Sequence, residues 1–545
     1  MYTMTDSTRH LARGRGAAAA AEDPRVLDAI AATLERGGNA VDAAVAGAAV
    51  QGVCRPMSGG LGGGGFMVIT LPTGRTVVIE HREQAAEAFG PDSFIEDGEP
   101  LPEAERRVHG ASVGVPGAPR AWGEALRVYG KLRPLEVFTP AIELADRGFE
   151  IDETLHREIK ERRDDFAMFE STRDLYLTPM GEPLPVGHVL RNPDLARTYE
   201  RLAADGLDSF YDGPLADAIV SAVNEPPEAM GNSRTVRPGP LSTRDLTLYQ
   251  ARHLEPMRYG FGDYELAGVP LPSSGSITIA EALGIIDRQR GSVGSSADLG
   301  DNRLVDVPVA ALLSDGYLHS RAVEKDLAGD RAVEPGDVRG NGAPWMAWEP
   351  ESPSTIHLTV TDGRGCTVSY TSTIVSMGGS GLVVPGTGML MNDALAGRAI
   401  DRGGKFGSGR PMGSMRPLSS MAPTMVFRDG ALVQTVGSPG GTTILTTVLQ
   451  ILSLTLDADM SLEEALAFPR VTQRNRADGR AEAEPAFLAL DVATELQARG
   501  HAFDTWRPVE GIGAANGLQW ASDGTVTAVA EPVRRGGGHA AVWDG

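Results

Sequence analysis

The sequence has only two cysteines among its 545 residues, Cys54 and Cys366. They lie far apart and match neither the spacing of metal ligands nor that of a redox motif. Long apolar runs are also missing, because no stretch reaches the roughly 20 residues that a membrane-spanning helix needs. We therefore expect no catalytic thiol, no metal site, no cofactor and no contact with a membrane.

The sequence also lacks a recognisable signal peptide. Arg13 and Arg15 precede an alanine run at residues 17–21. This run is shorter than the roughly 7–15 apolar residues that form the core of a signal peptide. We therefore expect the mature protein to begin near residue 1 and to remain in the cytoplasm.

Positive charge is scarce, because 50 basic residues face 72 acidic ones and the formal net charge is -22. Such a charge repels phosphate backbones, so we expect no nucleic-acid partner. The acidic residues are spread along the chain, which is typical of a solubility feature. With 41% hydrophobic and 22% charged residues and no long linker, the composition predicts one or two large packed units.

Residues 24–52 predict two alanine-rich helices. Gly37 and Gly38 end the first helix, and Asn39 can cap the second. The glycine run at 59–65 resembles a phosphate-binding loop, but the Lys-Ser/Thr pair of that motif does not follow it. Nucleotide binding is therefore not expected.

Strand patterns begin directly after this glycine run. Residues 67–71 and 76–80 predict two strands joined by a tight turn. Residues 117–345 read as mainly helical, without clear alternation. Near residue 353 the chain becomes rich in strand patterns and glycine, and it stays so for most of the way to its end.

Residues 355–361, TIHLTVT, alternate between polar and apolar side chains, which predicts a half-buried strand. A threonine at its start is a poor nucleophile unless a base removes its proton. His357 is one candidate base. The other is the threonine's own α-amino group, with a reference pKa of about 7.7–8.0, which is released only if the bond between Ser354 and Thr355 is cut. The loop-like residues 349–354 suit such a cut.

A hairpin follows this strand, and its loop length decides which residue faces Thr355. With a three-residue loop, Asp362 pairs with Cys366. Counting back along both strands then places Thr355 opposite Thr373. A two-residue loop would place Ser372 there instead.

Eight motifs in a fixed order resemble those of the γ-glutamyltranspeptidase family, and they extend along nearly the whole chain. They are GGNAVDAA (37–44), MSGGLGGGGFM (57–67), HRE (81–83), GVPG (114–117), PSSG (272–275), STIH (354–357), RPLSSMAPT (416–424) and GSPGG (437–441). The resemblance implies an α/β (α+β) protein with the four-layer αββα N-terminal-nucleophile hydrolase fold. It also implies a zymogen that cuts itself between Ser354 and Thr355 into a large subunit, 1–354, and a small subunit, 355–545, which stay together as a heterodimer.

The resemblance also implies roles for particular residues. The residues of the reaction would be the nucleophile Thr355, its hydrogen-bond partner Thr373, and the oxyanion-hole glycines Gly440 and Gly441. The residues that hold a substrate carboxylate would be Arg82, Ser419 and Ser420. Glycine lets the backbone approach the substrate closely, and a guanidinium can grip a carboxylate in two places.

Three positions depart from the family pattern. The family usually has asparagine where Val375 stands, and Gln or Glu and then Asp where Ala394 and Gly397 stand. These residues receive the α-ammonium of a γ-glutamyl donor, and a buried ammonium without them is costly. Asp393 could compensate only by shifting, since a neighbouring residue in a strand faces the other way.

We therefore expect an enzyme that forms a covalent acyl-enzyme from a small carboxylate-bearing substrate without a matching α-amino group. The bond that it breaks would be an amide or, as in some natural-product pathways, a C–C bond. Two alternatives remain open: an ordinary γ-glutamyl hydrolase or transpeptidase, such as a glutathione hydrolase, and a non-catalytic scaffold. Retention of Thr355, Thr373, Arg82 and the glycine pair argues against the scaffold.

Overall fold

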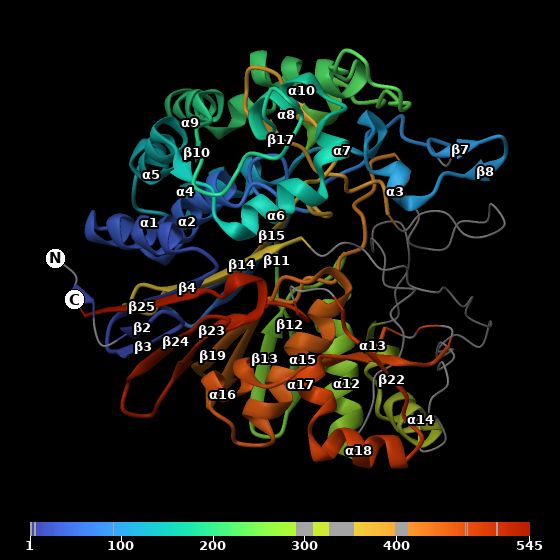
Figure 1. Ribbon diagram of the computed structural model, residues 1–545. Helices are drawn as coiled ribbons and strands as arrows, with labels where there is room; N and C mark the ends of the chain where they lie inside the picture. Colours follow the sequence, from blue (N-terminus) through green and yellow to red (C-terminus); the bar gives the residue numbers. More distant parts are fainter. Residues whose placement is uncertain are drawn as a thin grey trace.

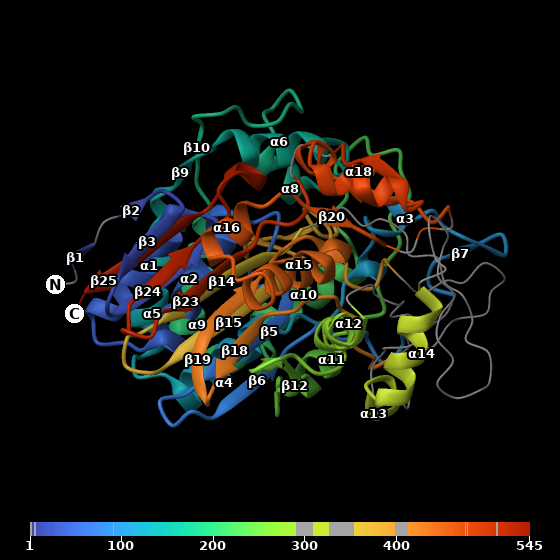
Figure 2. The ribbon, with the colours of Figure 1, turned by 90° about the horizontal axis from the view of Figure 1, so that it is seen from below.

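The computed structural model describes residues 3–4, 7–90, 92–289, 309–325, 354–397, 413–474, 476, 478–507 and 511–544. Two large sheets lie face to face in the middle of the molecule, and helices cover both outer surfaces (Figure 1). Both ends of the described chain lie at the same edge of the sheets, where the first strand pairs with the last (Figures 1 and 2).

Sheet A carries the strand predicted to begin with the nucleophile. Its eight antiparallel strands are, in order, β1 (Thr3–Met4), β25 (His539–Asp544), β4 (Ala17–Ala21), β14 (Ile356–Thr361), β15 (Thr367–Thr373), β5 (Gly64–Thr70), β6 (Thr76–Glu80) and β11 (Arg252–Leu254). The alanine run at 17–21 is thus an inner strand, paired with β25 on one side and β14 on the other.

Sheet B packs against the inner face of sheet A. Its eight antiparallel strands are β12 (Met257–Phe261), β13 (Tyr264–Gly268), β18 (Thr424–Arg428), β19 (Ala431–Gly437), β23 (Asn516–Trp520), β24 (Val526–Val529), β3 (Leu11–Gly14) and β2 (Ser7–Thr8). Small side chains such as Ala18, Ala20 and Ala528 fill part of the space between the two sheets.

Helices form the two outer layers. Sheet A is covered by α1 (Pro24–Glu35), α2 (Ala40–Cys54), α4 (Ala118–Tyr129), α5 (Pro134–Arg147) and α9 (Pro193–Asp205), with α6 (Glu153–Glu161), α8 (Glu170–Tyr176) and α10 (Pro214–Asn224) on the same side (Figure 1). Sheet B is covered by α12 (Gly275–Gln289), α15 (Ile444–Leu456) and α16 (Leu462–Ala467), and α14 (Asp315–Lys325) packs on α12.

The predicted helix pair and its cap are confirmed. Asn39 Oδ1 accepts hydrogen bonds from the amides of Val41 and Asp42, and the Asp42 carboxylate accepts one from the Asn39 amide. This capping box satisfies amides that the first turn of a helix leaves free. The helix that follows, α2, is buried along its whole length because it packs against α1, α5 and sheet A.

One expectation from the sequence was wrong. β14 is not half-buried but buried throughout, because α2 covers the face with Leu358 and Val360 while sheet B covers the other. In the described part of residues 117–345 helices predominate, as expected, although the strands β11, β12 and β13 lie at 252–268. The Gly262-Asp263 turn between two β-prone runs was the missed signal. Residues 349–353, predicted to form a loop, lie outside the described residues.

No helix in the described segments has the length and apolar character needed to span a bilayer. Neither do the described residues contain a group of three or more histidine, cysteine or acidic side chains arranged to hold a metal ion. Cys54 and Cys366 are both buried free thiols.

Candidate active site

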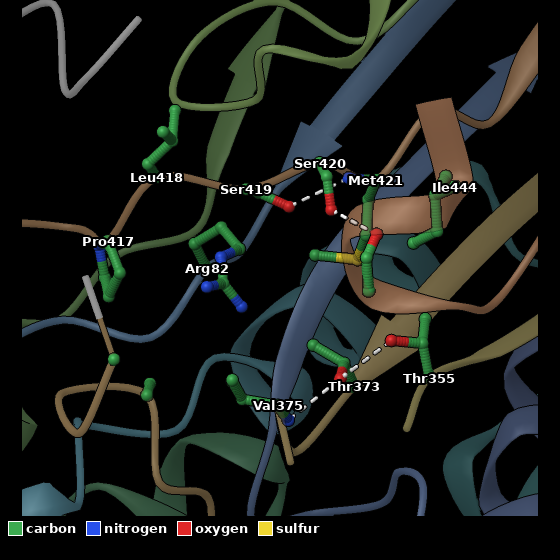
Figure 3. A pocket seen from close by; sticks show the side chains of 13 residues that line it. Arg82, Thr355, Thr373, Val375, Pro417, Leu418, Ser419, Ser420, Met421 and Ile444 are labelled. Carbon is green, nitrogen blue, oxygen red and sulfur yellow. Dashed lines mark hydrogen bonds between the residues drawn. The ribbon is translucent and has the colours of Figure 1, made fainter. Parts of the chain in front are cut away.

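The residues singled out from the sequence surround one pocket (Figure 3). Its volume is about 550 Å³, part of which is open to solvent. The pocket is lined by Arg82, Thr355, Thr373, Val375, Ala394, Gly397, Pro417, Leu418, Ser419, Ser420, Met421, Gly441 and Ile444. Two predicted site residues, Gly440 and Ser354, are not in this lining, and each directly precedes a lining residue in the chain, Gly441 and Thr355. Sequence positions from 82 to 444 are therefore brought together at one place.

The hairpin β14–β15 places Thr355 and Thr373 side by side. The amide of Asp362 donates to the carbonyl of Cys366 at 3.0 Å, and the pairing of β14 with β15 keeps the register of a three-residue loop. Thr355 and Thr373 thus face each other directly, with 3.2 Å between their Oγ1 atoms. The three-residue alternative is confirmed, and the two-residue loop is wrong.

Both hydroxyls lie against the carbonyl group of Ser354. Thr355 Oγ1 is 2.6 Å and Thr373 Oγ1 is 2.7 Å from the carbonyl oxygen of Ser354. Thr373 Oγ1 also accepts a hydrogen bond from the amide of Val375 at 2.8 Å. Ser354 itself is held by its own hydroxyl, which donates to the carbonyl of Met57 at 2.6 Å. The peptide bond before Thr355 is therefore fixed next to two hydroxyl groups.

His357 is not placed to act as the base for Thr355. Its Nδ1 is 2.8 Å from Thr371 Oγ1, and its ring packs against Gly437, where a Cβ would come within 2.2 Å of the imidazole. The ring is fully buried between the sheets, and burial lowers the pKa of His357 to about 3. His357 does not line the pocket. Its alternative role as a base is therefore not supported by the geometry.

Gly440 and Gly441 form the turn between β19 and the short 3₁₀ helix Gly441–Thr443, which continues into α15. Their φ angles are 136° and 55°, a region that favours glycine. Neither amide donates a hydrogen bond to any of the described residues. The amides lie at the amino end of a 13-residue helix, where the helix dipole is positive. This turn can stabilise a negative charge that develops next to Thr355.

Arg82 supplies positive charge on the opposite side of the pocket. It follows β6, and its side chain is only 5% exposed. Nη1 donates to Glu83 Oε2 at 2.6 Å, while its Nε has no hydrogen-bond partner within the described chain. Burial raises the pKa of Glu83, and the guanidinium of Arg82 opposes that rise. Arg82 can thus offer free N–H groups to an anion.

Ser419 and Ser420 have different partners. Ser419 Oγ accepts a hydrogen bond from the amide of Met421 at 3.1 Å, and among the described residues its own proton has no acceptor. Ser420 Oγ donates to the carbonyl of Gly441 at 2.7 Å. Ser419 is therefore ready to donate to a ligand, whereas Ser420 connects this segment to the glycine turn (Figure 3).

The PSSG motif at 272–275 has a structural role that the sequence did not reveal. Ser273 and Ser274 pack on the Ser419 backbone. The amide of Ser274 donates to the carbonyl of Ser419 at 2.8 Å, and the amide of Ser419 donates to the carbonyl of Pro272 at 2.9 Å. This backbone exchange holds the segment that carries Ser419 and Ser420 against the start of α12.

The third side of the pocket, formed by the three positions that depart from the family pattern, is apolar. Val375, Ala394 and Gly397 all line it. Asp393 does not, because its Oδ1 accepts from the amide of Ser376 at 2.9 Å and its side chain is buried behind the wall. Burial raises the pKa of Asp393. No shift of Asp393 into the pocket is seen.

The sequence matches the family model described as gamma-glutamyltranspeptidase over residues 28–297 and 289–542. The chain belongs to the γ-glutamyltranspeptidase family. A glutathione hydrolase proenzyme of Bacillus subtilis (strain 168) is 32% identical over 97% of this chain and 92% of its own length. An acylase named ACY 1 proenzyme, from Pseudomonas sp. (strain SE83), is also 32% identical, over 93% of this chain and 90% of its own length.

Solved structures of γ-glutamyltranspeptidase-family proteins share this fold. The cephalosporin acylase from Bacillus halodurans superimposes with a TM-score of 0.83 at 25% identity, covering 99% of this chain and 98% of its own. The predicted α+β N-terminal-nucleophile hydrolase fold is thus confirmed, and the chain is an enzyme of the hydrolase and acyltransferase type. The scaffold alternative has no support.

Sequence reasoning missed two residues next to Ser354 and Thr355. Ser58 lies in the glycine-rich motif, and its Oγ lies 3.0 Å from Ser354 Oγ, within hydrogen-bond distance. Arg535 comes from the far end of the chain and donates to the carbonyl of Thr355 at 2.8 Å. A pattern around residue 355 cannot reveal a partner 180 positions away.

Proposed function

We propose that this enzyme cuts itself before Thr355 and then hydrolyses or transfers acyl groups that carry a carboxylate but no free α-ammonium. The observation that carries the proposal is the charge of the pocket. Of the described lining residues, Arg82 is the only charged one. A pocket with one buried cation and an apolar wall favours an anionic acyl group over a zwitterionic one.

Self-cleavage begins with Thr355 Oγ1, which lies against the carbonyl of Ser354. The oxygen adds to the carbonyl carbon, the C–N bond breaks, and the hydroxyl proton ends on the released nitrogen. The product is an ester between Ser354 and Thr355. Thr373 can donate to the developing oxyanion, because its hydroxyl is 2.7 Å from the same carbonyl oxygen. Water then hydrolyses the ester and leaves a free α-amino group on Thr355.

Turnover then uses that amino group as the base. It accepts the Thr355 hydroxyl proton while Oγ1 attacks the substrate carbonyl, and the oxyanion is stabilised by the amides of Gly440 and Gly441. The leaving group takes the proton as its bond to the acyl carbon breaks. An acyl-enzyme results, which water or another acceptor resolves. Arg82 and Ser419 hold the substrate carboxylate, with Ser420 supporting the glycine turn.

The similarity to known proteins does not identify the substrate, because a relative named glutathione hydrolase and one named acylase are both 32% identical to this chain. The pocket supports the acylase type. A γ-glutamyl donor would bring an α-ammonium against Val375, Ala394 and Gly397, none of which has a side chain that can accept a hydrogen bond or supply a counter-charge. A glutaryl group has the same length and carboxylate but lacks the ammonium, so it fits without an unpaired charge.

The subunits follow from the proposed cleavage point. The large subunit would be residues 1–354 and the small one 355–545, and they would remain a heterodimer because strands of both share the two sheets. The named relatives are proenzymes, in keeping with such a precursor. The cytoplasm is the proposed location.

Purified protein on a denaturing gel tests the cleavage. We expect two bands, near the sizes of residues 1–354 and 355–545, with threonine at the new amino terminus. Thr355→Ala should remain one band and be inactive, whereas Thr355→Ser should retain the cut. A single uncut band in active wild-type protein would overturn the mechanism.

A comparison of γ-glutamyl-p-nitroanilide with glutaryl-p-nitroanilide tests the substrate class. We expect kcat/KM to favour the glutaryl compound by at least about tenfold, since an unpaired buried ammonium costs several kcal/mol. Clear preference for the γ-glutamyl compound would refute the acyl assignment while leaving the nucleophile in place.

A further inference from the structure

Arg535 reaches both sides of the Ser354–Thr355 bond from the end of the chain. Its Nη1 donates to the carbonyl oxygen of Thr355 at 2.8 Å, and its Nη2 donates to Ser58 Oγ at 3.1 Å. Ser58 Oγ in turn lies within hydrogen-bond distance of Ser354 Oγ, at 3.0 Å. One guanidinium thus fixes residue 355 directly and residue 354 through a single hydroxyl.

The strand ladder does not provide this support. β14 begins at Ile356, so Thr355 lies just before the first residue of the paired strand. Its carbonyl accepts from a side chain instead. Without that contact, the residue that carries the nucleophile would be held mainly by its neighbour in sequence and by its hydroxyl contacts.

Arg535 is itself held firmly. Its φ and ψ are 52° and 35°, in the left-handed region that non-glycine residues rarely occupy. Such a conformation persists when its surroundings determine it, and it is typical of functional sites. Two glycines with positive φ, Gly536 and Gly537, follow at once and let the chain turn into β25.

Two carboxylates of the large subunit lie beside the guanidinium. Glu22 directly follows β4, and its Oε1 lies 3.8 Å from the Arg535 guanidinium. Glu158 lies in α6, and its Oε1 is 3.9 Å from the same group. The side chains of Arg535, Glu22 and Glu158 are all buried, with at most 12% of each exposed to solvent. A buried arginine needs such counter-charges, so this cluster explains how a cation is kept behind the nucleophile.

We propose that Arg535 is a positioning residue for Thr355 in self-cleavage and in turnover. This rests on the proposed function, in which Thr355 is the nucleophile. The contact with the Thr355 carbonyl lies within the small subunit and survives the cut, whereas Ser58 contributes only through residue 354. Arg535 does not line the pocket, so it acts on the nucleophile and not on the substrate.

The proposal predicts different results for two variants. Arg535→Gln should slow self-cleavage about tenfold and lower kcat of the cleaved enzyme for glutaryl-p-nitroanilide about tenfold, with little change in KM, because one charge-assisted hydrogen bond is lost. Ser58→Ala should slow self-cleavage but leave kcat of the cleaved enzyme unchanged. Arg15→Gln, which removes an exposed ion pair with Asp523, is the matched control and should change neither.

The measurements are gel densitometry of the precursor against time and steady-state kinetics of the cleaved fraction. Arg535→Ala adds a readout that a structural role would not move, since added guanidinium ion should restore part of kcat. Wild-type cleavage and kcat in Arg535→Gln would overturn the proposal. If that variant does not fold, wild-type cleavage in Ser58→Ala, or no rescue of a folded Arg535→Ala, would overturn it. Failure of the proposed function would be distinguishable from failure of the Arg535 proposal. In that case wild-type protein would stay uncut, or Thr355→Ala would stay active.

Discussion

The two sides of the pocket are built in different ways. The reaction side, which we define as Thr355, Thr373, Gly440 and Gly441, lies at the ends of paired strands and at the start of a helix, so its geometry follows from the register of β14 with β15 and from the glycine turn. The recognition wall, defined as Val375, Ala394, Gly397 and Leu418, lies on connecting segments that follow the strands. A change in side chain there leaves the strand register untouched.

This difference teaches how one fold can keep its chemistry while its substrate changes. Attack by Thr355 depends on register and on amide positions, neither of which depends on the residue at 375, 394 or 397. Recognition depends on those side chains and on Arg82. Scaffold-held chemistry with variable loops is a common division of labour in enzymes. The two sides should therefore respond differently to substitution.

The largest effect is expected on the reaction side, from Gly440→Ala. Gly440 has φ 136°, and an added Cβ would lie 2.5 Å from Thr443 Oγ1, so the glycine turn must shift. Loss of one oxyanion donor typically lowers kcat about 10²–10³-fold, and KM should change little. Steady-state kinetics would measure both. Gly386→Ala is the control, because it also has positive φ, at 71°, but meets nothing within 4 Å; equal losses in both variants would contradict the claim.

The next effect is expected on substrate binding, from Arg82→Met. Charge-assisted hydrogen bonds to a carboxylate are worth about 1.5–3 kcal/mol, so kcat/KM for glutaryl-p-nitroanilide should fall about 10–100-fold, mainly through KM. Arg82→Lys keeps the charge but cannot bind the carboxylate at two points. Its kcat/KM should therefore lie between those of the wild type and Arg82→Met. A loss confined to kcat would show that Arg82 acts in the reaction and not in binding, which would contradict the division between the two sides of the pocket.

The sequence predicted the reaction side better than its surroundings. Counting residues around one loop limited the residue opposite Thr355 to Thr373 or Ser372, because strand pairing is periodic and local, and the observed register decides for Thr373. The strand at 17–21 could not be predicted in this way, since five alanines favour a helix and only the neighbours β25 and β14 make them a strand. The same holds for the complete burial of β14, which depends on sheet B, and for Arg535, whose contact spans 180 positions.

A graft on the recognition wall should change preference without changing the chemistry. Val375→Asn, Ala394→Gln and Gly397→Asp together restore the residue types that receive an α-ammonium. The ratio of kcat/KM for γ-glutamyl over glutaryl anilide should rise about tenfold, as expected for one new charge pair in a partly buried site. The same graft with Gly397→Asn lacks the charge and is the control. If both grafts shift the ratio equally, attraction to the ammonium is not the cause.

The smallest effect concerns Val375 alone, which has φ 81° although it is β-branched. Its amide donates to Thr373 Oγ1 at 2.8 Å and the next amide donates to Asp393, so the backbone is held in this conformation from both sides. Asparagine tolerates the left-handed region better, and Val375 is only half-buried. Val375→Asn should therefore stabilise the protein by about 1 kcal/mol and raise Tm by about 1–2 °C.

Calorimetry of Val375→Asn beside Val128→Asn, an exposed valine of α4 with ordinary helical geometry, separates strain from a general effect of asparagine. Only the first variant should gain stability. Hydrolysis of the glutaryl anilide by Val375→Asn then shows whether the strained valine serves recognition. If Tm rises while hydrolysis of the glutaryl anilide falls, the strained valine is retained because an apolar wall serves recognition, as expected when stability is exchanged for activity. If Tm rises and hydrolysis is unchanged, Val375 contributes nothing to recognition of the glutaryl group, which then depends on the other residues of the recognition wall, Ala394, Gly397 and Leu418.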